Sequence, residues 1–337
     1  MLVTVLAGGI GGSRFLRGVR AELDTRAGVG AARADEDLVA VVNTADDITL
    51  FGLRVSPDLD TVMYTLGGGS DEERGWGRAD ETFTAKAELA AYGAQPDWFG
   101  LGDRDLATHI VRTQMLDAGF ALSQVTEALC RRWVLGLRLL PMSDQRVETH
   151  IVVADEDAPA GARAMHFQEF WVRWHAALPV RDVVLVGIDD ATPAPGVVEA
   201  IAAADVVLLA PSNPVVSIGP ILAVPGIRAA LRQRTGPVVG VSPIISGSPV
   251  RGMADKLLPA VGVETDAGAV GLHYGSRADD GVLDGWLVHP SDADALPSLE
   301  AAGIAARAVP LLMHDVAASA QIAAAALELA DSTGRPG

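Results

Sequence analysis

Short runs of valine, isoleucine and leucine alternate along this chain with longer alanine-rich stretches that have the spacing of amphipathic helices. Each run is almost continuously apolar, which is typical of strands buried on both faces of a parallel sheet. Strands that alternate with helices form an α/β fold, in which helices cover both faces of the sheet. We therefore predict a Rossmann-like α/β fold with a mostly parallel sheet, whose strands lie at residues 3–6, 38–42, 182–186, 205–209 and 237–241.

The segment between the second and third of these strands is predicted to be mainly helical, with helices at residues 58–66, 79–92, 104–118 and 123–133. We predict a single domain over residues 1–337 with a mainly helical insertion at residues 58–178. An alanine-rich helix is expected at residues 317–330. The insertion is also rich in aromatic side chains, which either form a wall for a flat ligand or pack helices onto the sheet. These residues are Trp76, Trp98, Phe99, Phe167, Phe170, Trp171 and Trp174.

The composition limits the classes of function. Because 49% of the 337 residues are hydrophobic, the chain can form a substantial core. The one cysteine, Cys130, can form neither an internal disulfide nor a zinc site built from cysteines, which fits a reducing compartment. The first residues lack the features of a signal peptide, and no apolar run has the length of a membrane span, so we expect a cytoplasmic protein that does not enter a membrane. The formal net charge of −17 disfavours nucleic acid as a partner, and phosphate-bearing ligands are then expected to be small molecules.

Four glycines in five positions follow the first strand, in the run AGGIGGSR at residues 7–14. Such a turn, followed by a helix, lets backbone amides approach a phosphate oxygen. The run lacks the third glycine of a dinucleotide fingerprint, because Arg14 occupies that position, and it lacks the Lys-Ser/Thr of a P-loop. The turn is therefore either an anion cradle or only a tight entry into a helix. For the first interpretation, the nucleotide-binding residues are Gly9, Gly11, Gly12 and Ser13.

Acidic side chains follow the second strand, in the runs NTADD at residues 43–47 and SPDLD at residues 56–60. In an open parallel sheet, ligands bind outside the carboxyl ends of the strands, where these acids are expected to lie. Mg²⁺ suits such a place because it takes one or two carboxylates and bridges substrate phosphates. The alternative is helix capping by Asp46 and Asp58. We predict Asp46, Asp47 and Asp60 as metal ligands, with Asp46 and Asp60 as catalytic residues whose replacement by asparagine leaves folding intact.

Three further polar segments follow strands or open helices. In the run LGDRD at residues 101–105, Asp103 either caps the helix that begins there or joins Arg104 in binding a ligand. The runs PSNP at residues 211–214 and SPII at residues 242–245 follow the fourth and fifth strands, and their prolines rigidify both loops. Their polar groups face the same crevice as the glycine turn. From these loops we predict nucleotide binding by Ser212, Asn213, Ser217 and Ser242.

Taken together, these residues resemble the 2-phospho-L-lactate transferase family (CofD, called FbiA in actinobacteria) of coenzyme F(420) biosynthesis. The likeness covers nearly the whole chain and follows the family's order of motifs, at residues 6–12, 42–47, 56–61, 101–105, 165–169, 211–214 and 242–245. It is tightest to the actinobacterial branch, in the runs GGG at residues 67–69, RGWG at residues 74–77 and PDWFG at residues 96–100.

The resemblance implies a transfer reaction between small molecules. A phosphoenolpyruvyl or 2-phospho-L-lactyl group moves from its guanosine diphosphate ester to the ribityl hydroxyl of 7,8-didemethyl-8-hydroxy-5-deazariboflavin (Fo), and GMP is released. The actinobacterial likeness favours phosphoenolpyruvate. Mg²⁺ is the implied cofactor, and the predicted acceptor-binding residues are Asp60, Asp103, Arg104 and Trp98.

Two positions depart from the family pattern. Phe51 stands where many relatives have a histidine, so a role of that histidine does not transfer to this chain. Gly100 replaces a basic residue of archaeal relatives, so acceptor contacts inferred from that residue do not transfer either.

Two alternatives to the transferase are a nicotinamide-dependent oxidoreductase, which would need the intact glycine fingerprint, and a non-catalytic nucleotide-sensing module, which would not need the acidic cluster. The apolar composition and the alanine-rich C-terminal helix lead us to expect a homodimer.

Overall fold

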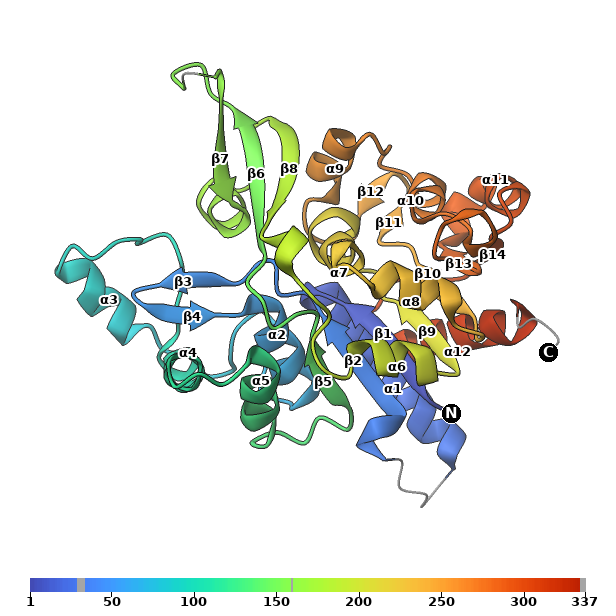
Figure 1. Ribbon diagram of the computed structural model, residues 1–337, viewed down its shortest axis with the longest axis horizontal. Helices are drawn as coiled ribbons and strands as arrows, with labels where there is room; N and C mark the ends of the chain where they lie inside the picture. The colour runs from blue at the N-terminus through green and yellow to red at the C-terminus, as the bar shows by residue number, and fades with distance from the viewer. Residues whose placement is uncertain (29–33, 159, 334–337) are drawn as a thin grey trace.

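The computed structural model describes residues 1–28, 34–158 and 160–333. Its centre is a seven-stranded sheet with the strand order β14-β13-β10-β9-β1-β2-β5, in which every neighbouring pair is parallel (Figure 1). The strands are β1 (Val3–Ala7), β2 (Leu38–Val42), β5 (Arg138–Pro141), β9 (Val206–Leu209), β10 (Val238–Val241), β13 (Gly285–Val288) and β14 (Ala305–Ala308). The predicted parallel α/β architecture is therefore confirmed.

Four of the five predicted strands lie in this sheet, as β1, β2, β9 and β10. Every residue of these four strands is buried, as their continuous apolar runs predict. Successive side chains enter two different cores, because a strand directs alternate residues to opposite faces. In β1, for example, Val5 belongs to one core and Leu6 to the other.

The prediction of a core strand at residues 182–186 is wrong. These residues belong to β8 (Val180–Val186), which pairs with β6 (Glu148–Ala154) in a three-stranded antiparallel sheet that also contains β7 (Ala162–His166). This small sheet stands apart from the main sheet at the top of Figure 1. The apolar run misleads because β8 is covered incompletely, and Val184 and Val186 remain 42% and 49% exposed.

Helices cover both faces of the main sheet. One face is covered by α1 (Gly9–Ala27), α2 (Pro57–Leu66), α5 (Leu122–Cys130) and α12 (Val316–Thr333). The other face is covered by α6 (Val197–Ala203), α7 (Gly219–Ala223), α8 (Ile227–Gln233), α10 (Ala267–Tyr274) and α11 (Leu296–Ala301). The predicted C-terminal helix thus corresponds to α12, which packs along α1.

Residues 58–178 contain the predicted helices as α2, α3 (Thr84–Ala91), α4 (Asp103–Asp117) and α5. The same segment also contributes β5 to the main sheet and β6 and β7 to the small sheet. From residue 138 onward its described part is therefore mainly strand and loop, with a short π-helix at Glu169–Arg173. The single domain with an insertion at residues 58–178 stays a prediction. A short hairpin, β3 (Ile48–Leu50) and β4 (Leu53–Val55), precedes α2 and extends beside α3 and α4 (Figure 1).

Among the described residues, no single helix is long and apolar enough to cross a membrane. One bent pair, Pro214–Ala223 with Ile227–Gln233, meets the criteria of length and composition when taken together.

The packing of α1 on α12 depends on a glycine. A β-carbon at Gly18 would lie 2.3 Å from the carbonyl carbon of Ser319, because the two helix backbones approach closely there. We expect Gly18→Ala to lower the free energy of unfolding by about 1–3 kcal/mol, since the helices must separate to admit the methyl group. Urea denaturation measures this change, and Thr25→Ala, at an exposed position of α1, is the control. Equal stability of the two variants would contradict the close approach.

Candidate active site

The glycine turn follows β1, the strand at which the order of the strands in the sheet reverses. From β1 the chain passes through α1 to β2 on one side, whereas β9 pairs with the other side of β1. The loops after β1 and β9 therefore diverge at the carboxyl ends of neighbouring strands. In open α/β sheets this switch point is the usual place for a ligand.

The turn itself is packed so closely that side chains are excluded. Gly8 precedes α1, and a β-carbon there would lie 2.6 Å from Oδ2 of Asp58 and 2.7 Å from Cβ of Ser217. A β-carbon at Gly11 would lie 2.7 Å from the carbonyl oxygen of Pro211, and Gly9 has a φ of +60°. The requirement for glycine thus comes from the close approach of α2 and of the loop after β9. The first amides of α1 lack partners within the helix, which suits an anion.

The predicted nucleotide-binding residues surround this turn, but most of their side chains have local partners. The hydroxyl of Ser212 donates to the carbonyl oxygen of Gly8 at 2.7 Å and accepts from its amide at 3.1 Å. The side-chain oxygen of Asn213 accepts from the amides of the following turn, and the hydroxyls of Ser13 and Ser242 donate to nearby carbonyl oxygens. Ser217 lies against Gly8. The structure therefore brings the loop after β9 against the glycine turn, whereas Ser242 lies at the end of β10, two strands from β1. The contacts of these residues with a nucleotide stay a prediction.

Asp46 and Asp58 form the buried acidic part of the crevice. Asn43 links the two loops, because its amide donates to Oδ2 of Asp58 at 3.0 Å and to the carbonyl oxygen of Val216 at 3.1 Å. Asp46 is 4% exposed, and its Oδ1 has no hydrogen-bond partner within the described residues. Burial, and then the negative charges of Asp58 and Asp47, raise the pKa of Asp46 well above its ordinary value. A carboxylate in this position is unusually ready to accept a cation or a proton.

Asp47 points to a different set of partners. Its Oδ2 accepts a hydrogen bond from the hydroxyl of Ser56 at 2.7 Å and lies 3.6 Å from Nε of Arg54, whereas Oδ1 has no partner within the described ranges. Burial raises the pKa of Asp47 to about 7 despite these contacts. The backbone oxygen of Asp47 accepts from Nε2 of His166, so the small sheet is anchored to the acidic turn.

Asp60, predicted to act in catalysis and metal binding, is paired with a buried arginine. Both carboxylate oxygens accept from the guanidinium of Arg112 on α4, and one of these contacts measures 3.1 Å. His109 lies beside the pair, with Nδ1 3.7 Å from Oδ2 of Asp60. Burial lowers the pKa of His109 to about 4, so its ring is neutral at pH 7. The charge of Asp60 is therefore compensated within the protein. Its predicted roles stay predictions.

Asp103 and Arg104, predicted to bind the acceptor, have structural partners. The carboxylate of Asp103 accepts from the hydroxyl of Thr82 at 2.6 Å and from the amides of Thr84 and Ala85, and so it closes the N-terminus of α3 rather than of its own helix. These hydrogen bonds, that of Thr82 foremost, lower the pKa of Asp103 to about 2. Arg104 donates to the carbonyl oxygen of Ala79 at 3.0 Å.

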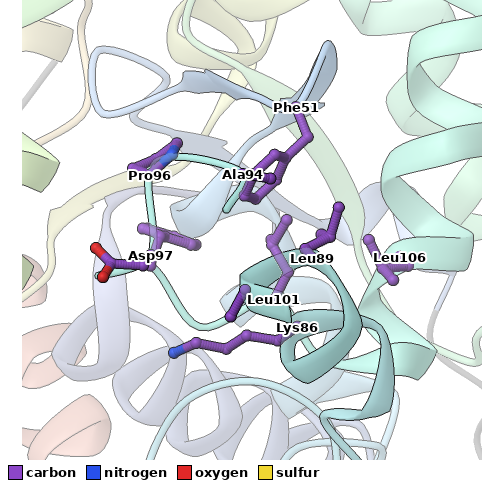
Figure 2. A pocket seen from close by; sticks show the side chains of 10 residues that line it. Phe51, Lys86, Leu89, Ala94, Pro96, Asp97, Leu101 and Leu106 are labelled. Carbon is purple, nitrogen blue, oxygen red and sulfur yellow. The ribbon is translucent and has the colours of Figure 1, made fainter. Parts of the chain in front are cut away.

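An apolar hollow lies under α3 and the turn of the β3–β4 hairpin. Figure 2 shows Phe51, Leu89, Leu101 and Leu106 around it, with the polar ends of Lys86 and Asp97 toward one side. Phe99 also lines the hollow, and the predicted acceptor residue Trp98 packs edge-to-face on Phe99 at 5.9 Å between ring centroids. The other aromatic residues of the predicted insertion differ in their exposure to solvent. Phe167 and Phe170 are buried in a core, whereas Trp76 is 45% exposed.

The model of the 2-phospho-L-lactate transferase CofD family matches residues 3–323 of this chain. The chain belongs to this family. It is therefore a transferase, and neither the oxidoreductase nor the non-catalytic module fits. Among curated members, the chain is 62% identical to the phosphoenolpyruvate transferase of Streptomyces coelicolor and 61% identical to that of Kitasatospora aureofaciens. Each alignment covers 98% of this chain and 98% of the relative.

Among solved structures, a UPF0052 family protein from Bacillus halodurans superposes with a TM-score of 0.59 over 96% of this chain and 98% of that one. With 19% sequence identity, this likeness concerns the fold alone.

Sequence reasoning for this CofD member missed some partners of its site. Asp58 and Asn43 stand inside the runs quoted above, and their polar character was the available signal. Arg112 and His109 gave no such signal, because their contact with Asp60 joins residues far apart in sequence.

The buried carboxylates predict an unusual dependence of stability on pH. The pKa of Asp47 rises to about 7 and that of Asp58 to about 6, each mainly through burial, from an ordinary 3.8. The folded protein then binds these protons more tightly than the unfolded chain does. Their stabilising effect is complete below about pH 4 and is lost as the pH rises toward 7, so the free energy of unfolding should fall over this range.

Urea denaturation across this pH range measures the effect, and Asp47→Asn should flatten the dependence. Asp103→Asn is the control, because the lowered pKa of Asp103 places its titration below this range. An unchanged slope in Asp47→Asn would contradict the assignment.

Proposed function

We propose that this enzyme transfers a phosphoenolpyruvyl group from its guanosine diphosphate ester to the ribityl hydroxyl of the deazaflavin Fo, giving dehydro coenzyme F(420)-0. The hydroxyl oxygen forms a bond to the acid-bearing phosphorus while the bond from that phosphorus to the GMP oxygen breaks. GMP leaves, and the hydroxyl proton is released. The relatives at 61–62% identity, which are named phosphoenolpyruvate transferases, support phosphoenolpyruvate, and the 2-phospho-L-lactyl ester is the alternative donor.

The observation that carries this proposal is the buried carboxylate of Asp46 beside Asp58, at the edge of the glycine turn, with an Oδ1 that has no hydrogen-bond partner within the described residues. Two buried acids with raised pKa values in one crevice are costly to the fold unless a cation or a proton joins them. A nucleoside diphosphate carries such a cation into the site. The turn and the acids together therefore suit the transfer of a substituted phosphoryl group.

Mg²⁺ fits these residues. Among the described residues, no group of three or more His, Cys, Asp or Glu side chains has the arrangement of a metal site. Mg²⁺ needs only one or two carboxylates when substrate phosphates supply further oxygens. We assign Asp46 as the first candidate, because its Oδ1 has no hydrogen-bond partner within the described residues. Asp58, whose Oδ2 accepts from Asn43, and Asp47, whose Oδ1 also lacks a partner there, lie near it. Asp60 comes last, since both of its oxygens accept from Arg112. When bound, the ion would neutralise charge on the phosphates.

The protein's own groups then orient the two substrates. The amides that begin α1 face the diphosphate of the donor. Asn43 holds the loops of Asp46 and Asp58 at a fixed separation through its hydrogen bonds. In-line positioning of this kind accounts for much of the rate in phosphoryl transfer.

For the deazaflavin acceptor, the hollow in Figure 2 offers an apolar surface beside the predicted contact Trp98. Asp103 would act there by capping α3, and Arg104 by holding the segment before α3 through the carbonyl oxygen of Ala79. The side chains of both residues are occupied by these contacts. Phe51, which replaces the histidine of many relatives, contributes to the apolar lining.

We also propose a cytoplasmic homodimer, as the composition suggests. Light scattering during size-exclusion chromatography tests the dimer, and a mass near 35.0 kDa would contradict it.

Calorimetry tests the proposed function directly. We expect GDP to bind, and to bind more tightly when Mg²⁺ is present, because the ion joins the phosphates to the acidic cluster. Nucleotide binding that is indifferent to Mg²⁺ would contradict the proposed site, and failure of guanine nucleotides to bind at all would contradict the donor class.

A further inference from the structure

Two arginines without protein partners lie near the glycine turn. Arg14 lies on the second turn of α1, and Arg251 lies in the segment after the two-residue strand β12 (Ser248–Pro249). Within the described residues, neither guanidinium has a hydrogen bond or an ion pair. The guanidinium of Arg251 covers Gly75, where a β-carbon would lie 2.8 Å from its terminal nitrogen and 3.6 Å from Cδ1 of Ile10 in the glycine turn.

The acids near these arginines are occupied elsewhere. Arg14 lines a polar hollow of about 460 Å³ with Arg17, Asp71, Glu72 and Asp315. Arg17 pairs with Glu72, and Asp71 accepts from the guanidinium and the amide of Arg74 at 2.8 Å each. Asp315 accepts from the amide at the start of α12 at 2.7 Å. Arg14 in this hollow and the exposed Arg251 beside Gly75 are therefore arginines without an ion pair within the described residues, in a chain with a net charge of −17.

Arg14 lies within electrostatic reach of two further arginines. Burial, and then the repulsion from Arg251 and Arg17, lower the pKa of Arg14, whereas the charge of Glu72 raises it. A bound anion would turn this repulsion into attraction. The arrangement thus has the features of a built anion site that the protein alone leaves unsatisfied.

We propose that Arg14 and Arg251 bind the carboxylate of the acid that is transferred, and so distinguish the activated donor from GDP. This inference rests on the proposed function. The donor has two kinds of anionic group, a diphosphate and a carboxylate. The amides of α1, and a cation held by Asp46 and Asp58, suit the diphosphate, which leaves the carboxylate for the arginines. A guanidinium also matches a planar carboxylate with two parallel hydrogen bonds.

Calorimetry with two ligands tests the inference, using GDP and its phosphoenolpyruvyl ester on the wild type, Arg14→Gln and Arg251→Gln. We expect each variant to weaken binding of the ester by about tenfold or more, and to change the affinity for GDP by less than about threefold. The KM for the ester should rise in parallel. Arg131→Gln, at the exposed C-cap of α5, is the control for loss of one positive charge and should leave both affinities unchanged.

An equal loss of affinity for GDP and for the ester would overturn the inference, because the arginines would then hold the diphosphate. Unchanged affinity for both ligands would overturn it as well. If the wild type binds GDP but turns over neither ester, the proposed function fails, and the carboxylate assignment fails with it. Circular dichroism before titration verifies that the variants are folded, as expected for side chains without protein partners.

Discussion

Replacing Asp46 with asparagine should lower turnover by roughly a hundredfold or more while the protein stays folded. The asparagine is isosteric, and it removes one of the buried negative charges that repel one another around the glycine turn. Affinity for GDP without Mg²⁺ should fall only modestly, because the amides of α1 still face the diphosphate. Steady-state release of GMP and thermal unfolding measure the two effects.

Asp117→Asn is the matched control, since this aspartate is exposed at the end of α4. It should retain normal turnover. If Asp46→Asn retained near-normal turnover with an unchanged requirement for Mg²⁺, the role of Asp46 would be wrong, and its burial would need a purely structural explanation.

Asp60→Asn should mainly affect stability, and we expect it to lower the free energy of unfolding by about 3–5 kcal/mol. From the sequence, the substitution was expected to leave folding intact. The structure changes this expectation, because Asp60 is the counter-charge of Arg112, whose side chain is 2% exposed. Asparagine would leave a buried guanidinium without a negative partner. Urea denaturation of the variant measures the loss.

A double variant separates pairing from catalysis. Asp60→Leu with Arg112→Met removes both charges, and its stability should recover much of what Asp60→Asn loses. If the double variant folds stably but has lost turnover, Asp60 or Arg112 also takes part in catalysis, as predicted for Asp60. Full stability of Asp60→Asn would contradict the importance of the ion pair.

The parts of the fold that could be predicted from the sequence are those with a local signal. Strands β1, β2, β9 and β10 combine continuous apolar runs with burial on both faces, so their pattern is unambiguous. β14 has the sequence AARA, whose alanines favour a helix when taken alone. It is a strand because it pairs with β13. Tertiary pairing of this kind leaves no local trace in composition.

The candidate site also has parts with a local signal in the sequence and parts without one. The glycine turn and the acidic runs could be found in the sequence because several polar or glycine residues stand together at strand ends. Their partners could not. The hydroxyl of Ser212 meets Gly8, and Arg112 meets Asp60, only after the chain has folded. Asp103 was considered as a cap of its own helix, whereas it closes α3. Knowledge of which side chains are already occupied therefore came from the structure alone.

The measurement that tests the central claim most directly is mass spectrometry of the product formed from Fo and each guanosine diphosphate ester with Mg²⁺. We expect the phosphoenolpyruvyl ester to give dehydro coenzyme F(420)-0 with one equivalent of GMP, and to be used in clear preference to the 2-phospho-L-lactyl ester. A clear preference for the lactyl ester would contradict the assigned donor. Absence of any deazaflavin product with either ester, from folded enzyme that binds GDP, would contradict the proposed transfer itself.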